Sequence, residues 1–402
     1  MTTIASEQAP AGLLRRVESV TGRLPDALRG AMLAVPRDRF LPDVVWIRDA
    51  GERAMRRCDR RTAPEQWMSA AYDDVAVVVQ VRDGAEVGPG ETPWPSSSAS
   101  QPSIVAGMLL ALDPRDGDRV LEIGTGSGWN AGLLTHHLGS AAVVTVEVDP
   151  ALADDARARL AALDLRPRVV AGDGAEGWAQ EAPFDRIICT CSVERVPTAW
   201  LDQTREGGRI VTPWATSWTA DGTLVLTVAG DGTAEGRFEP GGAFMRMRGH
   251  RSRIDDVDDV FSPAHRPDVG TTDVSPWDVA GDGDFAVGLT VPGVWHHWEA
   301  DPGAGVHTRM WLGDEEGTSW AAVDYDGRRL DEFTVRQFGP RRLWDAVAAA
   351  WKWWESAGRP GIDTFGLSVA GGVQRVWCGS ATGPSWPVPD LSVPGLSGRG
   401  SR

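Results

Sequence analysis

Glycine occupies three alternate positions of one short segment: Gly124, Gly126 and Gly128. A β-rich apolar run that ends at Glu122 precedes this segment, and a helix-like run near 128–138 follows it. Together these patterns predict a strand, a tight turn and a helix. Because glycine lacks a Cβ, it adopts positive φ at little cost and lets a ligand approach the backbone closely. The segment therefore predicts a binding site, and it constrains the fold more than any other stretch of the chain.

The residues around this turn alternate between strand-like and helix-like patterns. Strands are expected at 119–123, 141–148, 168–173, 184–190 and 208–212, with helices near 128–138, 150–163 and 197–205. Strands separated by helices imply crossover connections, and hence a parallel sheet with helices on both faces. Two further strands, 223–228 and 244–248, follow without a helix and are expected to pair antiparallel at one edge. The prediction is a doubly wound α/β fold, in which ligands bind at the carboxyl ends of the strands.

The chain is long enough for two or three domains, since it has 402 residues. Eleven of its nineteen tryptophans lie beyond residue 270, which marks a compositional boundary. We expect a first domain at 1–250 that opens with a helix at 8–35, a linker at 251–280, a smaller Trp-rich α+β domain at 281–386 and a disordered tail at 387–402.

Within the Trp-rich region, strands are expected at 285–291, 308–312, 319–324 and 372–378, and a helix near 340–356. Helical spacing places four apolar residues on one face of that helix: Trp344, Val347, Trp351 and Trp354. An aromatic face of this kind favours core packing over a platform on which a peptide stacks.

The net charge of −16 argues against a non-specific grip on nucleic acid or on an anionic membrane. A small molecule, a peptide or a basic protein is the more plausible partner. Four scattered cysteines form no C-x-x-C pair, so neither a disulfide framework nor a metal site is expected. Without a signal-peptide pattern or an apolar run of about 18 residues, the chain is predicted to be cytoplasmic. Its oligomeric state is unknown.

Three cofactor classes use a strand, a Gly-rich turn and a helix: dinucleotides, nucleoside triphosphates and S-adenosylmethionine. A triphosphate loop ends in Gly-Lys-Ser/Thr, whereas Trp129-Asn130 stand at that place here. The glycine spacing also differs from G-x-G-x-x-G, the pattern that binds dinucleotides. A carboxylate at Glu122 would repel a pyrophosphate, but it suits a sulfonium cofactor that carries an ammonium group.

Two further acids end successive predicted strands. Glu147 is placed to accept hydrogen bonds from both ribose hydroxyls, and Asp173, between Gly172 and Gly174, from an adenine amino group. Each acid alone could be a solvated loop carboxylate. With Glu122, the three in order favour S-adenosylmethionine, with S-adenosylhomocysteine as product.

A cluster of serines, 96–100, leads through Gln101-Pro102 into an apolar helix at 104–110. On local sequence alone, a serine hydroxyl that caps the helix is the favoured interpretation. Hydroxyls and free N–H groups at a helix start also suit a carboxylate ligand, so that alternative stays open.

Several motifs in order resemble the protein-L-isoaspartate O-methyltransferase family over about residues 8–250. They are Val35–Pro42 (Val-Pro-Arg-Asp-Arg-Phe-Leu-Pro), Ala71–Asp74, Ser98–Pro102, Leu121–Gly128, Gly172–Gly174 and Glu206–Val211. The resemblance implies a Rossmann-like class I S-adenosylmethionine-dependent methyltransferase domain that acts on a peptide carboxylate. It also implies that Ser100 is the active-site hydroxyl, with Ser98 as a second catalytic position, and it favours the carboxylate-binding role of the serines.

The cofactor-binding residues expected from the turn, the acids and the resemblance together are Ser98, Ala99, Gln101, Glu122, Gly124, Thr125, Gly126, Gly128, Asn130, Glu147, Asp173 and Gly174.

The chain departs from the family's usual pattern in three places. The stretch 79–95 is longer, Cys191-Ser192-Val193-Glu194 replaces small residues and prolines, and the Trp-rich region is foreign to compact repair enzymes. Two segments of the Trp-rich region, Gly339–Trp344 and Trp353–Gly361, resemble actinobacterial relatives of the family that are associated with lanthipeptide and graspetide biosynthesis. Those relatives methylate an ordinary Asp of a ribosomal peptide, and the ester then cyclises to a succinimide, or aspartimide.

The leading hypothesis is therefore carboxyl O-methylation of Asp in a modified peptide, such as a macrocyclic precursor peptide. Repair of isoaspartyl residues in damaged proteins is the alternative. A peptide-binding module that retains the cofactor without turnover, and a methyltransferase for small carboxylic acids, are weaker alternatives.

Overall fold

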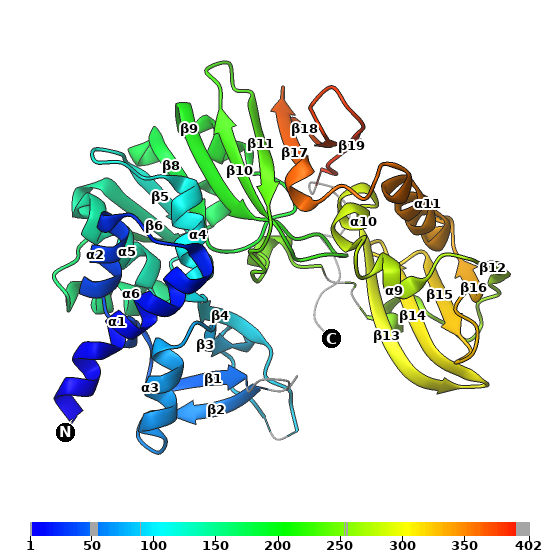
Figure 1. Ribbon diagram of the computed structural model, residues 1–402, viewed down its shortest axis with the longest axis horizontal. Helices are drawn as coiled ribbons and strands as arrows, with labels where there is room; N and C mark the ends of the chain where they lie inside the picture. The colour runs from blue at the N-terminus through cyan, green and yellow to red at the C-terminus, as the bar shows by residue number, and fades with distance from the viewer. Residues whose placement is uncertain (1, 49–54, 89, 253, 255, 391–402) are drawn as a thin grey trace. The chain divides into compact units, whose positions relative to one another are not determined.

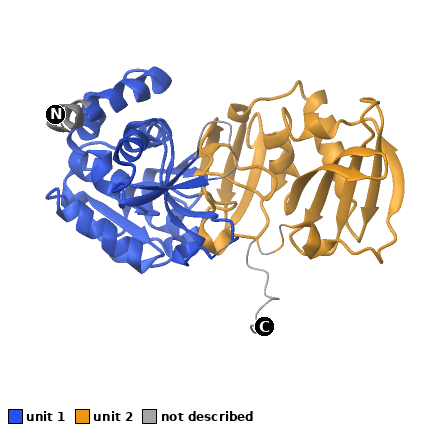
Figure 2. Cartoon of the chain, turned by 90° about the horizontal axis from the view of Figure 1, so that it is seen from below, with its two compact units in different colours: residues 1–191, 197–212, 225–234 blue, residues 192–196, 213–224, 235–402 orange. Residues whose placement is uncertain are grey.

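The computed structural model describes the chain except for residues 1, 49–54, 89, 253, 255 and 391–402 (Figure 1). It divides into two compact units. Unit 1 comprises residues 1–191, 197–212 and 225–234, and unit 2 comprises residues 192–196, 213–224 and 235–402 (Figure 2). The division falls earlier than the predicted boundary near residue 250, and the chain crosses it several times.

Unit 1 contains parallel strands in the order β7-β6-β5-β8-β9, and β10 lies beside β9 in the same sheet. Its strands are β5 (Val120–Ile123), β6 (Val143–Glu147), β7 (Arg168–Ala171), β8 (Phe184–Cys189), β9 (Thr204–Pro213) and β10 (Thr223–Val228). The helices between them are α5 (Trp129–Leu138), α6 (Pro150–Ala161) and α7 (Thr198–Asp202), and α4 (Pro102–Leu112) precedes β5.

The pairs β5–β6, β5–β8, β6–β7 and β8–β9 are parallel, which confirms the Rossmann-like α/β prediction. Every residue of β5, β6 and β8 is buried, as expected for strands covered on both faces. The strand order reverses at β5, between β6 and β8, so the ligand site of such a fold is expected at the carboxyl end of β5.

The N-terminal part of unit 1 differs from the single predicted helix at 8–35. It forms α1 (Thr2–Thr21) and α2 (Asp26–Ala34), and the break holds Gly22 at φ +77 and Pro25, which precedes α2. A 3₁₀ turn, η1 (Arg37–Phe40), and α3 (Pro64–Tyr72) follow. A four-stranded sheet of order β2-β1-β3-β4 completes the unit, with β1 (Val44–Arg48), β2 (Met55–Asp59), β3 (Val77–Val81) and β4 (Pro95–Ala99).

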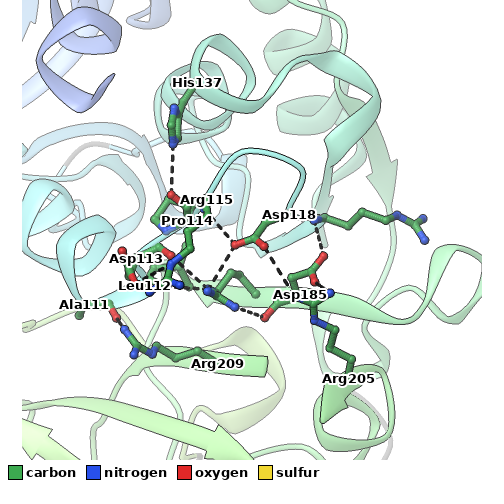
Figure 3. Close-up of polar contacts among 12 residues, drawn as sticks. Ala111, Leu112, Asp113, Pro114, Arg115, Asp118, His137, Asp185, Arg205 and Arg209 are labelled. Carbon is green, nitrogen blue, oxygen red and sulfur yellow. Dashed lines mark hydrogen bonds and ion pairs between the residues drawn. The ribbon is translucent and has the colours of Figure 1, made fainter. Parts of the chain in front are cut away.

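Buried charges join the amino ends of β5 and β8 (Figure 3). Asp185 accepts a hydrogen bond from the backbone N–H of Arg119 at 2.6 Å and forms an ion pair with Arg205. Asp118 pairs with Arg186 at 3.4 Å, and Arg186 Nε donates to the carbonyl of Leu112 at 3.0 Å. Because these contacts occupy the amino ends, they stabilise the sheet away from its carboxyl end.

Unit 2 contains an antiparallel sheet of order β12-β16-β15-β14-β13. Its strands are β12 (Asp268–Thr272), β13 (Val294–Gly303), β14 (Val306–Asp314), β15 (Trp320–Tyr325) and β16 (Phe333–Phe338). The unit also holds α8 (Val257–Val260), α9 (Pro276–Val279), α10 (Asp284–Thr290), α11 (Leu343–Ser356), β17 (Phe365–Ala370), β18 (Val373–Cys378), β19 (Ser385–Pro387) and most of β11 (Ala234–Glu239).

Helix α11 buries the four residues expected on one face, so their role in packing is confirmed: Trp344, Val347, Trp351 and Trp354. Three other predictions for this part of the chain are wrong. Residues 285–291 form helix α10 rather than a strand, because a short, wholly apolar run does not distinguish the two by its pattern. Residues 244–248 form no strand in the described structure, and the expected linker 251–280 contributes β12 to the sheet.

The predicted tail lies outside the described residues from 391 on, and residues 385–387 belong to β19. No helix in the described part of the chain combines the length and the apolar character needed to cross a membrane.

Candidate cofactor and active site

The glycine turn connects β5 to α5 in a backbone conformation that side chains oppose. Gly124, Gly126 and Gly128 have φ values of +89, +52 and +91. A Cβ on Gly124 would lie 3.0 Å from Thr190 Oγ1, and one on Gly128 would lie 3.1 Å from the Cβ of Ala156. Both the conformation and the close packing therefore require glycine at the ends of the turn.

The middle of the turn lies against the serine segment. A Cβ on Gly126 would be 3.5 Å from Ser97 Oγ and 3.7 Å from the carbonyl oxygen of Ser98. A second link joins the two regions, because Gln80 Nε2 donates to Asp149 at 2.8 Å while Gln80 Oε1 accepts from Ser96 at 2.9 Å. The structure thus brings together two motifs that the sequence places more than twenty residues apart.

Glu147 ends β6 beside the turn, as predicted. Its Oε2 accepts from the N–H of Gly126 at 2.8 Å and its Oε1 from the N–H of Asp149 at 3.1 Å. A carboxylate oxygen has two lone pairs, so these bonds leave capacity to accept from ribose hydroxyls. The position fits the predicted role in cofactor binding.

Glu122 lies beneath the turn and is completely buried. Its Oε1 accepts from Asn130 Nδ2 at 2.7 Å and its Oε2 accepts from the Thr145 hydroxyl. Burial raises the pKa of Glu122 to about 7, although the bonds from Thr145 and Asn130 oppose that shift. The expectation of direct contact with the cofactor needs correction, because Glu122 is enclosed by protein and positions Asn130 and the turn instead.

Thr125 shares this arrangement beneath the turn. Its hydroxyl lies 2.6 Å from that of Thr145, and Thr125 is 4% exposed, so its side chain faces the protein. Only its backbone remains a candidate for contact with a ligand.

The third predicted acid, Asp173, is exposed in the loop after β7. This loop adjoins the end of β6, because the N–H of Gly172 donates to the carbonyl of Glu147 at 2.9 Å. Asp173 accepts from the N–H of Ala175 at 2.9 Å, and the carbonyl of Gly174 accepts from the Trp200 indole at 2.8 Å. These bonds hold the loop in place, with Asp173 on the same edge of the sheet as Glu147.

The serines do not cap α4, so the capping prediction is wrong. The N-cap residue is Gln101, and no side chain of that residue caps the helix. Asp74, from the segment after α3, instead accepts from the N–H of Ser103 at 2.8 Å and from Gln101 Nε2 at 3.3 Å. Ser98 belongs to β4 opposite Val78, and Ser100 follows that strand.

Ser98 and Ser100 are both partly exposed. Neither hydroxyl has a hydrogen-bond partner among the residues that the structure describes, so both are available to a ligand. Ala99 is buried between them, which limits it to backbone contacts.

Arg37 is a functional residue that the sequence reasoning did not single out. Its Nη1 donates to the carbonyls of residues 70, 71 and 73, and its Nη2 to those of residues 75, 99 and 100, at 2.8–3.3 Å. Burial lowers the pKa of Arg37 to about 10, which still keeps it charged at neutral pH. The residue fixes the backbone on which Ser100 stands, and its place in the Val35–Pro42 motif was the only signal.

The edge of the sheet thus combines a glycine turn, acids at the ends of two neighbouring strands, and two serine hydroxyls without a hydrogen-bond partner among the described residues. This donor and acceptor set fits a nucleoside that carries an amino-acid tail, with a second ligand at the serines.

Comparison with known proteins agrees with this site. The family described as protein-L-isoaspartate(D-aspartate) O-methyltransferase (PCMT) matches residues 13–233. Protein-L-isoaspartate O-methyltransferase 2 of Anaeromyxobacter sp. (strain Fw109-5) is 36% identical over 181 residues, which are 45% of this chain and 68% of that protein. The protein-L-isoaspartate O-methyltransferase of Methylorubrum populi is 41% identical over 183 residues, 45% of this chain and 81% of that protein.

A solved protein-L-isoaspartate O-methyltransferase has a similar fold, with a TM-score of 0.52 at 20% identity. The alignment covers 92% of this chain and 99% of that one, and so it includes residues beyond 250. The region expected to be foreign to such enzymes therefore has a structural counterpart in that protein. Because the family model matches more than half of the chain and these relatives are covered to two thirds or more, the chain belongs to the protein-L-isoaspartate(D-aspartate) O-methyltransferase family.

Proposed function

We propose that this protein methylates the free carboxylate of L-isoaspartyl residues in peptides and proteins. Membership of the family makes the chain an S-adenosylmethionine-dependent carboxyl O-methyltransferase. The observation that carries the proposal is the closeness of the glycine turn to the serine segment: a Cβ on Gly126 would lie 3.5 Å from the Ser97 hydroxyl and 3.7 Å from the Ser98 carbonyl oxygen. The relatives named for isoaspartate support that substrate over ordinary aspartate.

The chemistry needs little from the side chains besides orientation. S-adenosylmethionine supplies a methyl group on a sulfonium, and it leaves as S-adenosylhomocysteine. A carboxylate is ionised at neutral pH, so no residue has to remove a proton from it. Ser100 and Ser98 would donate hydrogen bonds to the carboxylate and hold one oxygen in line with the methyl–sulfur bond. Arg37 donates to the carbonyls of residues 99 and 100, so it contributes to this alignment as a positioning residue.

Methylation of an ordinary Asp in a ribosomally made peptide is a second candidate. The segment between β3 and β4 favours it, because this longer connection carries Trp94, which is 44% exposed, directly before the serine strand. An exposed tryptophan at this position offers a contact to a peptide whose backbone lacks the extra methylene of an isoaspartyl residue. The resulting methyl ester would be displaced by the next backbone nitrogen, which releases methanol and closes a succinimide.

Two synthetic peptides of one sequence separate these candidates, one with L-isoaspartate and one with L-aspartate at a single position. Methyl transfer is followed by mass spectrometry, with the methyl ester and the succinimide formed from it both counted as product. Isoaspartate repair predicts kcat/KM at least about tenfold higher for the isoaspartyl peptide. Equal or greater transfer to the aspartyl peptide would overturn that choice and support the ribosomal-peptide candidate.

The same experiment tests the weaker alternatives. Binding of S-adenosylhomocysteine without methylation of either peptide would indicate a binding module. Methylation of small carboxylic acids, with neither peptide as substrate, would indicate a small-molecule enzyme.

A further inference from the structure

Two cysteines lie side by side at the carboxyl end of β8. The Sγ atoms of Cys189 and Cys191 are 3.3 Å apart, and the Cys189 thiol donates to the carbonyl of Cys191 at 3.1 Å. Cys189 is fully buried, whereas residue Cys191 is partly exposed and is therefore the member of the pair nearer to solvent. Neither thiol has a role in the methyl transfer described above.

The pair lies against the first glycine of the cofactor turn. Cys189 is the register partner of Ile123, and the residue between the cysteines, Thr190, donates through its hydroxyl to the carbonyl of Gly124. A Cβ on Gly124 would lie 3.7 Å from Cys191 Sγ. Any movement of this three-residue segment therefore reaches the turn that binds the cofactor.

We propose that Cys189 and Cys191 are a modification site, at which oxidation by a peroxide forms a disulfide that weakens cofactor binding. The Cys191 thiolate attacks one peroxide oxygen, which breaks the O–O bond and leaves a sulfenic acid and one water after protonation. The sulfur of Cys189 then attacks the sulfenic sulfur, the S–O bond breaks, and the hydroxide leaves with the thiol proton as a second water. Two thiols are oxidised by two electrons while hydrogen peroxide is reduced to two waters.

The geometry links this reaction to the turn. A disulfide requires the sulfurs to approach to about 2.05 Å, so the pair has to close by more than 1 Å. Strand β8 ends at Cys189 and residues 190–191 form a bend, so this closure across a single intervening residue strains and shifts the segment. Because Thr190 is bonded to Gly124, the bend displaces the turn. A bridge with such strain is also readily reduced, which makes the modification reversible.

The reaction is slow in the resting protein. Contact with Cys189, burial and the negative charges of Glu147 and Asp173 all raise the pKa of Cys191, so little thiolate is present at neutral pH. Oxidation is therefore expected over minutes to hours at peroxide concentrations on the order of a millimolar, rather than within seconds.

Peptide mass spectrometry of the full-length protein tests the chemistry directly. After hydrogen peroxide and removal of the excess, free thiols are alkylated and the protein is digested with trypsin. The peptide 187–195 carries both cysteines of the pair and no other. We expect it to be two hydrogens lighter and unalkylated, and to become alkylatable after reduction. Alkylation of both sulfurs in this peptide after peroxide treatment would overturn the proposal, whatever the enzyme's substrate.

Calorimetric titration with S-adenosylhomocysteine tests the consequence. The oxidised protein is expected to bind at least about tenfold more weakly than the reduced protein, with affinity restored by dithiothreitol. Cys191→Ser should make the affinity insensitive to peroxide, whereas Cys378→Ser, which changes a thiol in β18, should leave the sensitivity unchanged. Equal affinities of the bridged and reduced wild-type protein would refute the link to the cofactor turn.

Discussion

The backbone N–H of Gly126 donates to Oε2 of Glu147 at 2.8 Å, so one carboxylate holds the glycine turn and is also the group proposed to bind the ribose of the cofactor. Glu147→Ala removes both functions and is expected to abolish measurable binding of S-adenosylhomocysteine. In Glu147→Gln, an amide N–H₂ replaces one carboxylate oxygen and faces the backbone N–H of Gly126 or of Asp149, so one of these two hydrogen bonds is lost. This variant should bind S-adenosylhomocysteine about 10- to 100-fold more weakly. Isothermal titration calorimetry measures both variants.

Asp154→Ala is the matched control, because Asp154 lies on the exposed side of the following helix and pairs with Arg157 at the surface. It should bind S-adenosylhomocysteine like the wild type. Normal binding by Glu147→Ala would show that the ribose assignment is wrong.

The sequence offered two roles for the serine cluster, capping of α4 and binding of a carboxylate. In the structure Asp74 caps the helix, and Ser100 remains the candidate for carboxylate binding. Asp74 accepts from the N–H of Ser103 at the start of α4, so Asp74→Ala should lower the free energy of unfolding by about 1 kcal/mol. Ser100→Ala removes a hydroxyl without a protein partner, so it should leave stability unchanged while it lowers kcat about 10- to 100-fold. Urea unfolding and steady-state methylation measure the two effects.

Cofactor affinity distinguishes the outcomes further. Ser100→Ala should bind S-adenosylhomocysteine within about twofold of the wild type, because the proposed function assigns this hydroxyl to the substrate carboxylate rather than to the cofactor. Unchanged turnover in this variant would contradict the catalytic assignment.

The central fold was predictable because its signals are local. The run before Glu122 and the glycines after it fix a strand and a turn within a few residues, and the same kind of pattern recurs at Glu147 and Asp173. Helix α11 was predicted for a similar reason, since Trp344 and Trp351 repeat at helical spacing on a face that the structure buries. Such patterns need no knowledge of distant contacts.

The features that were missed depend on contacts between distant residues. Asp74 replaces the serines as the cap of α4 from 29 residues away, and no local rule for capping anticipates that. Arg37 contacts backbone carbonyls up to 63 positions along the chain, so its role is visible only after folding. Residues 285–291 lack the polar face that would give the alternation of apolar and polar residues typical of a surface helix. Their helix follows from tertiary packing.

Arg37 is the next residue to test, because six carbonyls share one guanidinium. Arg37→Lys supplies only three donors from a single point, so several buried carbonyls lose their partner. We expect the free energy of unfolding to fall by at least about 2 kcal/mol, and KM for the isoaspartyl peptide to rise more than the Kd for S-adenosylhomocysteine.

Arg39→Lys is the control in the same motif, since Arg39 is exposed and should tolerate the change. An Arg37→Lys enzyme with wild-type stability and an unchanged KM would rule out the positioning role.

Glu122 gives the protein a pH dependence whose sign can be worked out. Burial raises its pKa from 4.5 to about 7, so the folded state holds a proton that the unfolded chain has already released between these values. Since the folded state binds more protons in that window, stability falls as the pH rises from about 4.5 to 7 and is then constant. A pKa shift of this size corresponds to a fall in the free energy of unfolding on the order of 3 kcal/mol across this pH range.

Glu122→Gln should remove this pH-dependent contribution to the free energy of unfolding. The amide can accept from Asn130 and donate to the hydroxyl of Thr145, so the hydrogen bonds around it can be kept. We expect the difference in free energy of unfolding, variant minus wild type, to increase with pH from 4.5 to 7 and to level off above 7. Glu194, whose pKa burial also raises to about 7, titrates in both proteins and cancels in the difference. Urea unfolding followed by tryptophan fluorescence at several pH values measures it, and a difference independent of pH would mean that Glu122 is ionised throughout.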